Sequence, residues 1–393
     1  MVPAIPRSEW MLDPALSFLN HGSFGATPRV LLEKQHMLQN EMEAEPVRFL
    51  EREIFTRLAE ARRRLAAFVG ARTEDLVFVP NATTAVNAVL RSFPLKSGDR
   101  VLVTDHAHNA CRNTAGFVCA QSGGEVTVAK VPFPIRSSDE VVDALLSAVT
   151  TRTRLAVIEH VTSPTALVFP VERLVQELES RGVHTLVDGA HAPGMLPLQI
   201  DRLGASFYTG NCHKWMCAPK GAALLWVRQD MQESVRPLAI SHGATSPRPG
   251  ASRYEVEFSW TGTDDPSAYL SVPSAIDHFA SALPGGWNAL RARNRSLALA
   301  ARDLLCAALE IEHPAPDDMI GALVSVPLPL TAGEFRPDVL QRTLFEAHRI
   351  EVPVIHWPKP PHRLLRVSAQ AYNSLAEYEA LAAVLREKVR NAL

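Results

Sequence analysis

Short apolar runs alternate with amphipathic segments along the first 230 or so residues of the chain. The amphipathic segments 83–92, 109–121, 139–148 and 171–180 have the periodicity of helices. Strand and helix alternating at this spacing predict an α/β fold, with a mostly parallel seven-stranded sheet and helices on both faces. The apolar runs predicted as strands are 76–79, 101–104, 126–131, 155–158, 185–187, 206–208 and 222–227.

The segments on either side of this alternation predict further units. A helical stretch begins after Thr27 and Pro28, is interrupted near Pro46, and ends at Gly70. Residues 231–261 are rich in Pro, Gly, Ser and Arg, which predicts a long functional loop. Helical patterns resume at 268–282 and 287–309, and 322–393 mixes strands with a final helix. We therefore expect an N-terminal arm (1–20), a large domain (21–265) that contains the loop, and a small C-terminal α+β domain (266–393).

Charge and cysteine content narrow the classes of partner. The net charge of −2 gives no reason to expect nucleic acid or an anionic membrane as a partner. No run of about 18 apolar residues predicts a membrane span, and the first ten residues lack the apolar core of a signal peptide. Five cysteines, an odd and small number, are typical of reduced thiols and predict a cytoplasmic protein. Cys212 and Cys217 have no second pair at zinc-finger spacing, so no metal site is predicted.

Polar and ionisable residues follow five of the predicted strands. In an open α/β sheet, ligands bind beyond the carboxyl ends of the strands, so these residues are expected to converge. They include Asp, Lys and several His residues, which are more than solvation of loops requires. The segments are 80–84, 105–109, 159–163, 188–191 and 211–214.

Each of these residues also has a simpler interpretation. The segment 81–84 could cap the following helix, and His108 could be a capping or surface histidine. His106 and His108 could bind a metal together with Asp188 and His191. Lys214 could be solvated, although His213 and Trp215 on either side of it favour a less exposed position.

One chemistry uses four of these residues together. A lysine that attacks an aldehyde must lose its proton, and a pyridine nitrogen that stays protonated needs a carboxylate. A phosphate needs a helix N-terminus with hydroxyl groups, and a ring needs a flat side chain against one face. Lys214, Asp188, Thr83 and His108 supply these functions. The pattern indicates a site for pyridoxal 5′-phosphate (PLP).

Several motifs carry a resemblance to a known family. They are NHGSFG (20–25), NATTAVN (81–87), VDGAHA (187–192), HKW (213–215), APKG (218–221), TGT (261–263) and RVS (366–368). With these motifs the whole chain resembles the class V aminotransferase group of fold-type I PLP enzymes, and within it the isopenicillin N epimerase-like proteins. The resemblance implies the PLP-dependent transferase fold type I and a homodimer with active sites at its interface.

The resemblance also implies roles for individual residues around the cofactor. Lys214 would hold PLP as a Schiff base, Asp188 would pair with the pyridine nitrogen, and His108 would stack on the ring. His191 and Ser163, with Thr162 as a substitute for the latter, would lie near the ring hydroxyl. The phosphate ligands would be Thr83, the Thr84 amide, Asn211, His213 and, from the neighbouring subunit, Thr263.

For the substrate, the resemblance implies that Arg366 binds the α-carboxylate, helped by the backbone near His21, Gly22 and Ser23. The substrate would be an amino acid from which Lys214 removes the α-proton. We expect epimerisation, with a carbon–sulfur lyase acting on a cysteine conjugate or sulfoxide, or a class V transaminase, as alternatives.

Other activities are disfavoured by specific absences in the sequence. A cysteine desulfurase needs a nucleophilic Cys before the carboxylate-binding Arg, yet no Cys lies between Glu310 and Arg366, and Cys306 falls in an apolar helical pattern. A nicotinamide-binding sheet wants Gly-x-Gly-x-x-Gly after its first strand, which is missing. A catalytically silent scaffold would not need the combination above. In the 231–261 loop, we hypothesise that Arg248 or Arg253 contacts a distal acidic group of the substrate.

Overall fold

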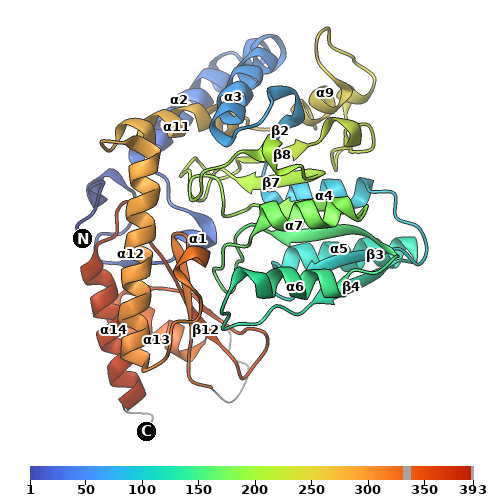
Figure 1. Cartoon of the computed structure of the whole chain (residues 1–393). Coiled ribbons are helices and arrows are strands. Elements are labelled where there is room, and N and C mark those ends of the chain that lie inside the picture. Colours follow the sequence, from blue (N-terminus) through green and yellow to red (C-terminus); the bar gives the residue numbers. More distant parts are fainter. Residues whose placement is uncertain (331–337, 391–393) are drawn as a thin grey trace.

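The structure is a computed structural model that describes residues 1–330 and 338–390 (Figure 1). Its main sheet has seven strands in the order β2-β8-β7-β6-β5-β3-β4. β8 is antiparallel to both of its neighbours, and the remaining pairings are parallel. The prediction of a mostly parallel seven-stranded sheet is therefore confirmed. The strands are β2 (Leu76–Val79), β3 (Arg100–Thr104), β4 (Glu125–Ala129), β5 (Thr153–Glu159), β6 (His184–Asp188), β7 (Phe207–Asn211) and β8 (Ala223–Val227).

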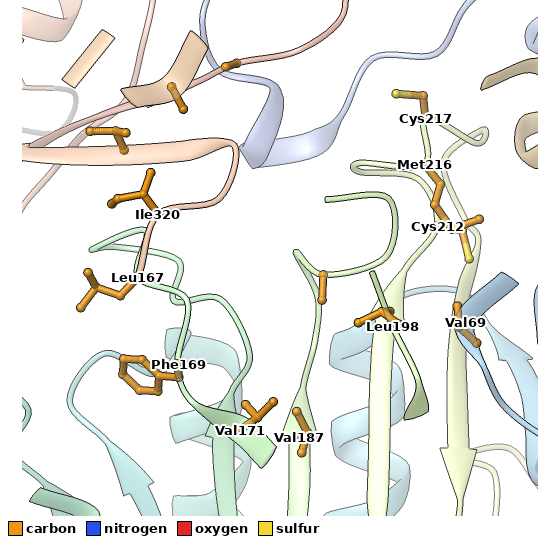
Figure 2. Close-up of a cluster of buried hydrophobic side chains, with 14 of the residues drawn as sticks. Val69, Leu167, Phe169, Val171, Val187, Leu198, Cys212, Met216, Cys217 and Ile320 are labelled. Carbon is orange, nitrogen blue, oxygen red and sulfur yellow. The ribbon is translucent and has the colours of Figure 1, made fainter. Parts of the chain in front are cut away.

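Helices cover both faces of this sheet. Because the side chains of alternate strand residues point to opposite faces, each strand can contribute to a core on either side. Val101 and Val103 belong to one core, which includes residues of α4 (Ala82–Ser92), α5 (Asn109–Ser122) and α9 (Arg253–Ser259). Leu102, between them, belongs to the other core, with α3 (Ile54–Val69), α6 (Ser138–Ala148) and α7 (Val171–Ser180). Figure 2 shows part of this second core, where Phe169, just before α7, and Val171, its first residue, belong to the same cluster as Val187 of β6.

The N-terminal segments follow the prediction closely. The helical stretch consists of α2 (Arg29–Ala44), a π-helical segment η2 (Arg48–Glu53) and α3. Gly70 ends α3 in the left-handed conformation that glycine adopts readily. Thr27 does not cap α2, because its hydroxyl donates to the carbonyl of Ala218 instead. Short elements nearby are η1 (Arg7–Glu9), β1 (Ser17–Phe18), α1 (His21–Phe24) and η3 (Thr73–Asp75).

The segment 231–261 contains a helix that was predicted as loop. α9 follows the 3₁₀ turns η4 (Gln229–Met231) and η5 (His242–Ala244). It forms because Tyr254 and Phe258 are buried against the sheet, and the Tyr254 hydroxyl donates to the carbonyl of Leu225 at 3.0 Å. Three apolar residues in seven are too few for their periodicity to stand out among the neighbouring Pro and Gly residues.

The C-terminal part contains a second sheet, with the antiparallel order β11-β12-β9. β1, from the predicted N-terminal arm, pairs with β10 of this part. Residues 331–337 and 391–393 of the predicted small domain lie outside the described residues, and the domain boundaries stay a prediction. The remaining elements are α8 (Ile200–Leu203), α10 (Ser267–Leu270), α11 (Val272–Ser281), α12 (Gly286–Leu309), η6 (Asp317–Met319), β9 (Leu323–Pro327), α13 (Val339–His348), β10 (Ile350–Glu351), β11 (Val354–Ile355), β12 (Leu364–Ser368) and α14 (Leu375–Arg390).

Within the described residues, no helix combines the length and apolar character that crossing a bilayer requires.

Candidate active site

A cavity of about 340 Å³ opens where the five polar strand ends meet. The parallel strands point their carboxyl ends at this edge of the sheet, so residues far apart in sequence come together. Side chains from α1 complete the wall. The lining residues are Ser23, Phe24, Asn81, Ala82, Thr83, His108, Cys111, Glu159, Val161, Ser163, Asp188, Ala190, His191, Asn211, His213 and Lys214.

Lys214 follows β7 and lines the cavity instead of extending into solvent, so the interpretation as a solvated lysine is wrong. Burial lowers the pKa of its amine to about 8, and the positive charge of Arg366 acts in the same direction against the opposing effect of Asp188. Its Nζ lies 3.2 Å from His191 Nε2. About a tenth of this amine is therefore unprotonated at pH 7, far more than for an exposed lysine, and the unprotonated form is the one that a nucleophile or base requires.

Asp188 ends β6 and is 5% exposed. Its Oδ1 accepts from the Ala190 amide at 3.0 Å, and its Oδ2 accepts from the Cys111 thiol at 3.2 Å. Glycine is required at position 189, because a Cβ there would collide with the side chain of Tyr208. Among the described residues, no Lys or Arg forms an ion pair with Asp188. A buried carboxylate of this kind suits a protonated ring nitrogen.

The N-terminus of α4 forms one wall. Asn81 caps the helix by accepting from the Thr84 amide at 2.9 Å, and Asn211 accepts from the Ala82 amide at 2.9 Å. Thr83 is exposed toward the cavity, as an anion-binding hydroxyl should be. The capping interpretation thus holds for Asn81, and the anion-binding interpretation fits Thr83.

Two of the predicted phosphate ligands have competing contacts. The Thr84 amide is already bonded to Asn81, and its side chain lines a different cavity beside Phe258 and Trp260, so its predicted role is not supported. His213 lines the active-site cavity, but its Nδ1 donates to the Ala222 carbonyl at 3.0 Å and burial lowers its pKa to about 4. A neutral His213 therefore presents an acceptor nitrogen, and a bound dianion would have to raise its pKa.

Arg366 projects from β12 and is 4% exposed. Its Nη1 donates to the carbonyl and hydroxyl of Ser163 at 2.7 and 3.1 Å, and its Nη2 donates to Ser23 Oγ at 2.9 Å. Its Nε has no partner among the described residues. Burial lowers its pKa to about 10, so the group stays cationic at neutral pH. Serines hold this buried guanidinium, and no Asp or Glu in the described part of the chain forms an ion pair with it, so it suits an anionic ligand.

His21 and Gly22, in the predicted site at residues 21–23, form hydrogen bonds with other parts of the chain. His21 is fully buried between Tyr372 Oη, at 3.0 Å from its Nδ1, and the Lys214 carbonyl, at 2.9 Å from its Nε2. The Gly22 amide donates to Ser368 Oγ at 2.9 Å. The Gly22 amide is therefore not free for a substrate, and the predicted backbone contact of His21 stays a prediction. Of these three residues, Ser23 lines the cavity.

The remaining histidines separate into two groups. His108 precedes α5 and lines the cavity. Partial burial of its ring there lowers its pKa. His106 is buried away from it, with its nitrogens 2.6 Å from Thr165 Oγ1 and 3.0 Å from the Val131 carbonyl. Across the described residues, no group of three or more His, Cys, Asp or Glu is arranged to hold a metal ion. The metal alternative for His106 and His108 is not supported.

Thr162 and Thr263 lie outside the cavity. The Thr162 hydroxyl is 2.7 Å from Thr165 Oγ1 and accepts from the Leu167 amide, so Ser163 is the better candidate of the two. Thr263 lines a separate cavity of about 510 Å³ beside Arg248. Its predicted role toward a neighbouring subunit stays a prediction.

The two arginines of the 231–261 loop differ. Arg253 forms an ion pair with buried Glu257 at 2.9 Å and donates to the carbonyls of Gln232 and Glu233, so it is not free for substrate. Arg248 packs over the ring of Phe55 and lines the cavity that contains Thr263.

Glu159 was not singled out from the sequence as a site residue. It ends β5, opposite Asp188 of β6, and is 2% exposed. Its Oε2 accepts from Thr104 Oγ1 at 2.6 Å, and its Oε1 has no partner among the described residues. Burial raises its pKa to about 8, and the charge of Asp188 adds to the effect. The sequence shows polar residues after both predicted strands, but it does not show that β5 and β6 are neighbours with Glu159 opposite Asp188.

These residues fit PLP. The aldehyde requires an amine, the pyridine nitrogen a carboxylate, and the phosphate a helix N-terminus; Lys214, Asp188 and Thr83 at the start of α4 line one cavity. The partnerless Nε of Arg366 indicates that an anionic ligand is missing from its surroundings.

Comparisons with known proteins agree with this fit. The chain is 38% identical to the isopenicillin N epimerase of Amycolatopsis lactamdurans, covering 97% of both chains. It is 34% identical to that of Streptomyces clavuligerus, covering 96% of both. A probable chloroplastic L-cysteine desulfhydrase of Arabidopsis thaliana is 32% identical, over 96% of this chain and 84% of that protein.

Solved structures share the fold at lower identity. A complex of the cystine C–S lyase C-DES with cysteine persulfide has a TM-score of 0.79 at 21% identity, covering 95% of this chain and 98% of that one. The family model described as "Aminotransferase class-V" matches residues 18–381. The chain therefore belongs to the class V aminotransferase family of PLP-dependent enzymes.

Proposed function

We propose that the protein is an epimerase, in which the α-proton of an amino acid leaves from one face and a proton from a second, solvent-exchanging donor is added on the opposite face. The observation that carries the proposal is the combination of Lys214, whose pKa is lowered to about 8, with a buried cationic Arg366 whose Nε has no partner within the described ranges. The two isopenicillin N epimerases, at 38% and 34% identity, support the epimerase assignment.

Five residues of the site have parts in the proposed reaction. Arg366 binds the α-carboxylate through its guanidinium, which Ser23 and Ser163 hold in orientation. Lys214 would hold the cofactor through Nζ and, once released, accept the α-proton at that atom. Asp188 keeps the proton on the ring nitrogen, and bound PLP supplies the electron sink that makes the α-proton acidic.

The thiols of the chain argue against persulfide chemistry. Burial raises the pKa of the Cys111 thiol well above its ordinary value, although this residue lines the cavity. Burial likewise raises the pKa of Cys212 and Cys217, and that of Cys306 to about 11. A desulfurase needs a thiolate nucleophile, which none of these cysteines supplies at neutral pH.

Elimination of a β-substituent is the second candidate, because L-cysteine desulfhydrases are among the relatives at 28–32% identity. It begins with the same proton transfer to Lys214, so the same residues serve it. Transamination comes third, since the family supports it only by its general name.

Incubation of the PLP-loaded enzyme with isopenicillin N, L-cysteine and common amino acids in D₂O separates these reactions. Epimerisation yields both stereoisomers with deuterium at Cα. Elimination yields pyruvate and ammonia from cysteine, and transamination yields a keto acid with aminated cofactor. The Lys214→Ala variant serves as the control. Pyruvate without deuterated stereoisomers contradicts the epimerase proposal, and deuterium exchange by Lys214→Ala at the wild-type rate contradicts the role of Lys214.

The proposal includes a homodimer in which Thr263 contacts the phosphate of the partner's cofactor. Thr263 is exposed and lies outside the cavity of its own chain, as such a role requires. Analytical ultracentrifugation tests the dimer. A monomer with full activity contradicts this part of the proposal.

A further inference from the structure

The indole of Trp215 makes a contact that the proposed reaction does not use. Trp215 directly follows Lys214 in sequence and is 2% exposed. Its Nε1 donates to His191 Nδ1 at 3.3 Å. An indole N–H can only donate, so this contact requires a lone pair on His191 Nδ1.

The contact determines which nitrogen of His191 carries hydrogen. Burial lowers the pKa of His191 well below its ordinary value, and the charge of Arg366 lowers it further, so the ring is neutral. A neutral imidazole has one N–H. Because Nδ1 accepts from Trp215, that hydrogen is on Nε2.

The same logic extends to the lysine. His191 Nε2 lies 3.2 Å from Lys214 Nζ, and an N–H at Nε2 needs an acceptor there. An ammonium group has no lone pair, whereas a free amine has one. We propose that Trp215 is a positioning residue, which fixes the hydrogen of His191 on Nε2 and thereby favours the free amine of Lys214 over its ammonium form.

The opposite arrangement is disfavoured by a clash of donors. A protonated Lys214 would donate to Nε2 and move the imidazole hydrogen to Nδ1. The Nδ1–H would then face the indole N–H across 3.3 Å, leaving two buried donors unsatisfied. Removing the indole N–H removes this penalty and lets the lysine keep its proton.

Other groups also act on the charge of Lys214 and are left unchanged by a substitution at Trp215. Arg366 disfavours the charged amine, and Asp188 favours it. The groups that face or flank Lys214 are Arg366 from β12, Asp188 from β6, Cys111 and His108 at α5, His21 of α1, His191 from the segment after β6, and His213.

The inference rests on the proposed function in one respect: the free amine matters because Lys214 has to attack an aldehyde. Its test does not depend on that function, because the protonation of Lys214 can be measured in the apoenzyme. Failure of the epimerase assignment and failure of this inference are therefore separate results.

The experiment is trace acylation of the apoenzyme over a range of pH, with the Lys214 peptide quantified by mass spectrometry. Trp215→Phe keeps a packed ring and removes the N–H. We expect it to lower the rate of Lys214 acylation at neutral pH about tenfold, because one unsatisfied donor pair no longer opposes the ammonium. The matched control is Trp226→Phe on β8. This substitution removes a buried indole N–H that donates to Asp201 Oδ1 at 2.9 Å.

A second background distinguishes tautomer control from packing. In His191→Leu, no imidazole remains to be oriented, so adding Trp215→Phe should leave the acylation rate unchanged. If Trp215→Phe does not fold, benzothienylalanine at position 215 keeps the ring shape and replaces N–H by sulfur. Equal acylation rates in wild type and Trp215→Phe, or an equal loss in the His191→Leu background, overturn the inference.

Discussion

Replacing Glu159 by Gln should remove a pH-dependent loss of stability. The structure raises the pKa of this buried carboxyl from its ordinary 4.5 to about 8. Between these values the folded protein keeps the proton and the unfolded chain releases it, so stability falls as pH rises through this interval. Gln has nearly the shape of the protonated acid, and its amide oxygen can still accept the hydrogen bond from Thr104.

The size of the effect follows from the interval. A shift of one pKa unit corresponds to about 1.4 kcal/mol. Ionisation of Glu159 in the unfolded chain therefore lowers the free energy of unfolding by about 3 kcal/mol at neutral pH. Glu159→Gln should therefore be more stable than wild type by about that amount near pH 7, and by less than about 1 kcal/mol near pH 5. Other groups titrate in both proteins and cancel in the difference.

Urea denaturation of the apoenzymes between about pH 5 and pH 8 measures this difference. Glu172→Gln, at an exposed position of α7, is the matched control and should show no pH-dependent difference from wild type. If the stability gap between Glu159→Gln and wild type is the same at every pH, Glu159 is not held protonated and the reasoning about the paired carboxyls is refuted.

Three further substitutions test the site and the loop. Asp188→Asn should lower kcat roughly 10²- to 10³-fold, because a neutral amide no longer keeps the ring nitrogen protonated; unchanged kcat contradicts this. Arg366→Lys should raise KM roughly 10- to 100-fold with a smaller change in kcat, since an ammonium cannot hold both serines and a carboxylate; steady-state kinetics measure it. Arg253→Ala should lower unfolding stability by about 2 kcal/mol by breaking its pair with Glu257, without raising KM; a thermal melt showing no loss opposes this.

The sheet could be predicted because its strands are short apolar runs separated by polar strand ends. Buried parallel strands read as continuous apolar runs, and β2 and α7 have the predicted bounds. Asp188 was identifiable because it directly follows such a run, and Lys214 because it lies in the polar segment shortly beyond one. α9 was missed because its burial depends on packing against β2 and β8, which a seven-residue pattern does not reveal.

Contacts between segments distant in sequence account for the errors in the site. Glu159 became part of the site through the register that pairs it with Asp188. The His21 ring and the Gly22 amide form hydrogen bonds with Tyr372 and Ser368, which lie about 350 positions away in the sequence. A motif identifies which residues are close to a site, but it does not show whether their hydrogen-bonding groups are still free.

The attachment point of the cofactor tests the central claim most directly. The enzyme is loaded with PLP, reduced with borohydride, digested and analysed by mass spectrometry. The structure predicts a stable cofactor adduct on Lys214 alone, absent from the Lys214→Ala protein. An adduct on another lysine, or full activity in an enzyme whose Lys214 carries none, would contradict the account.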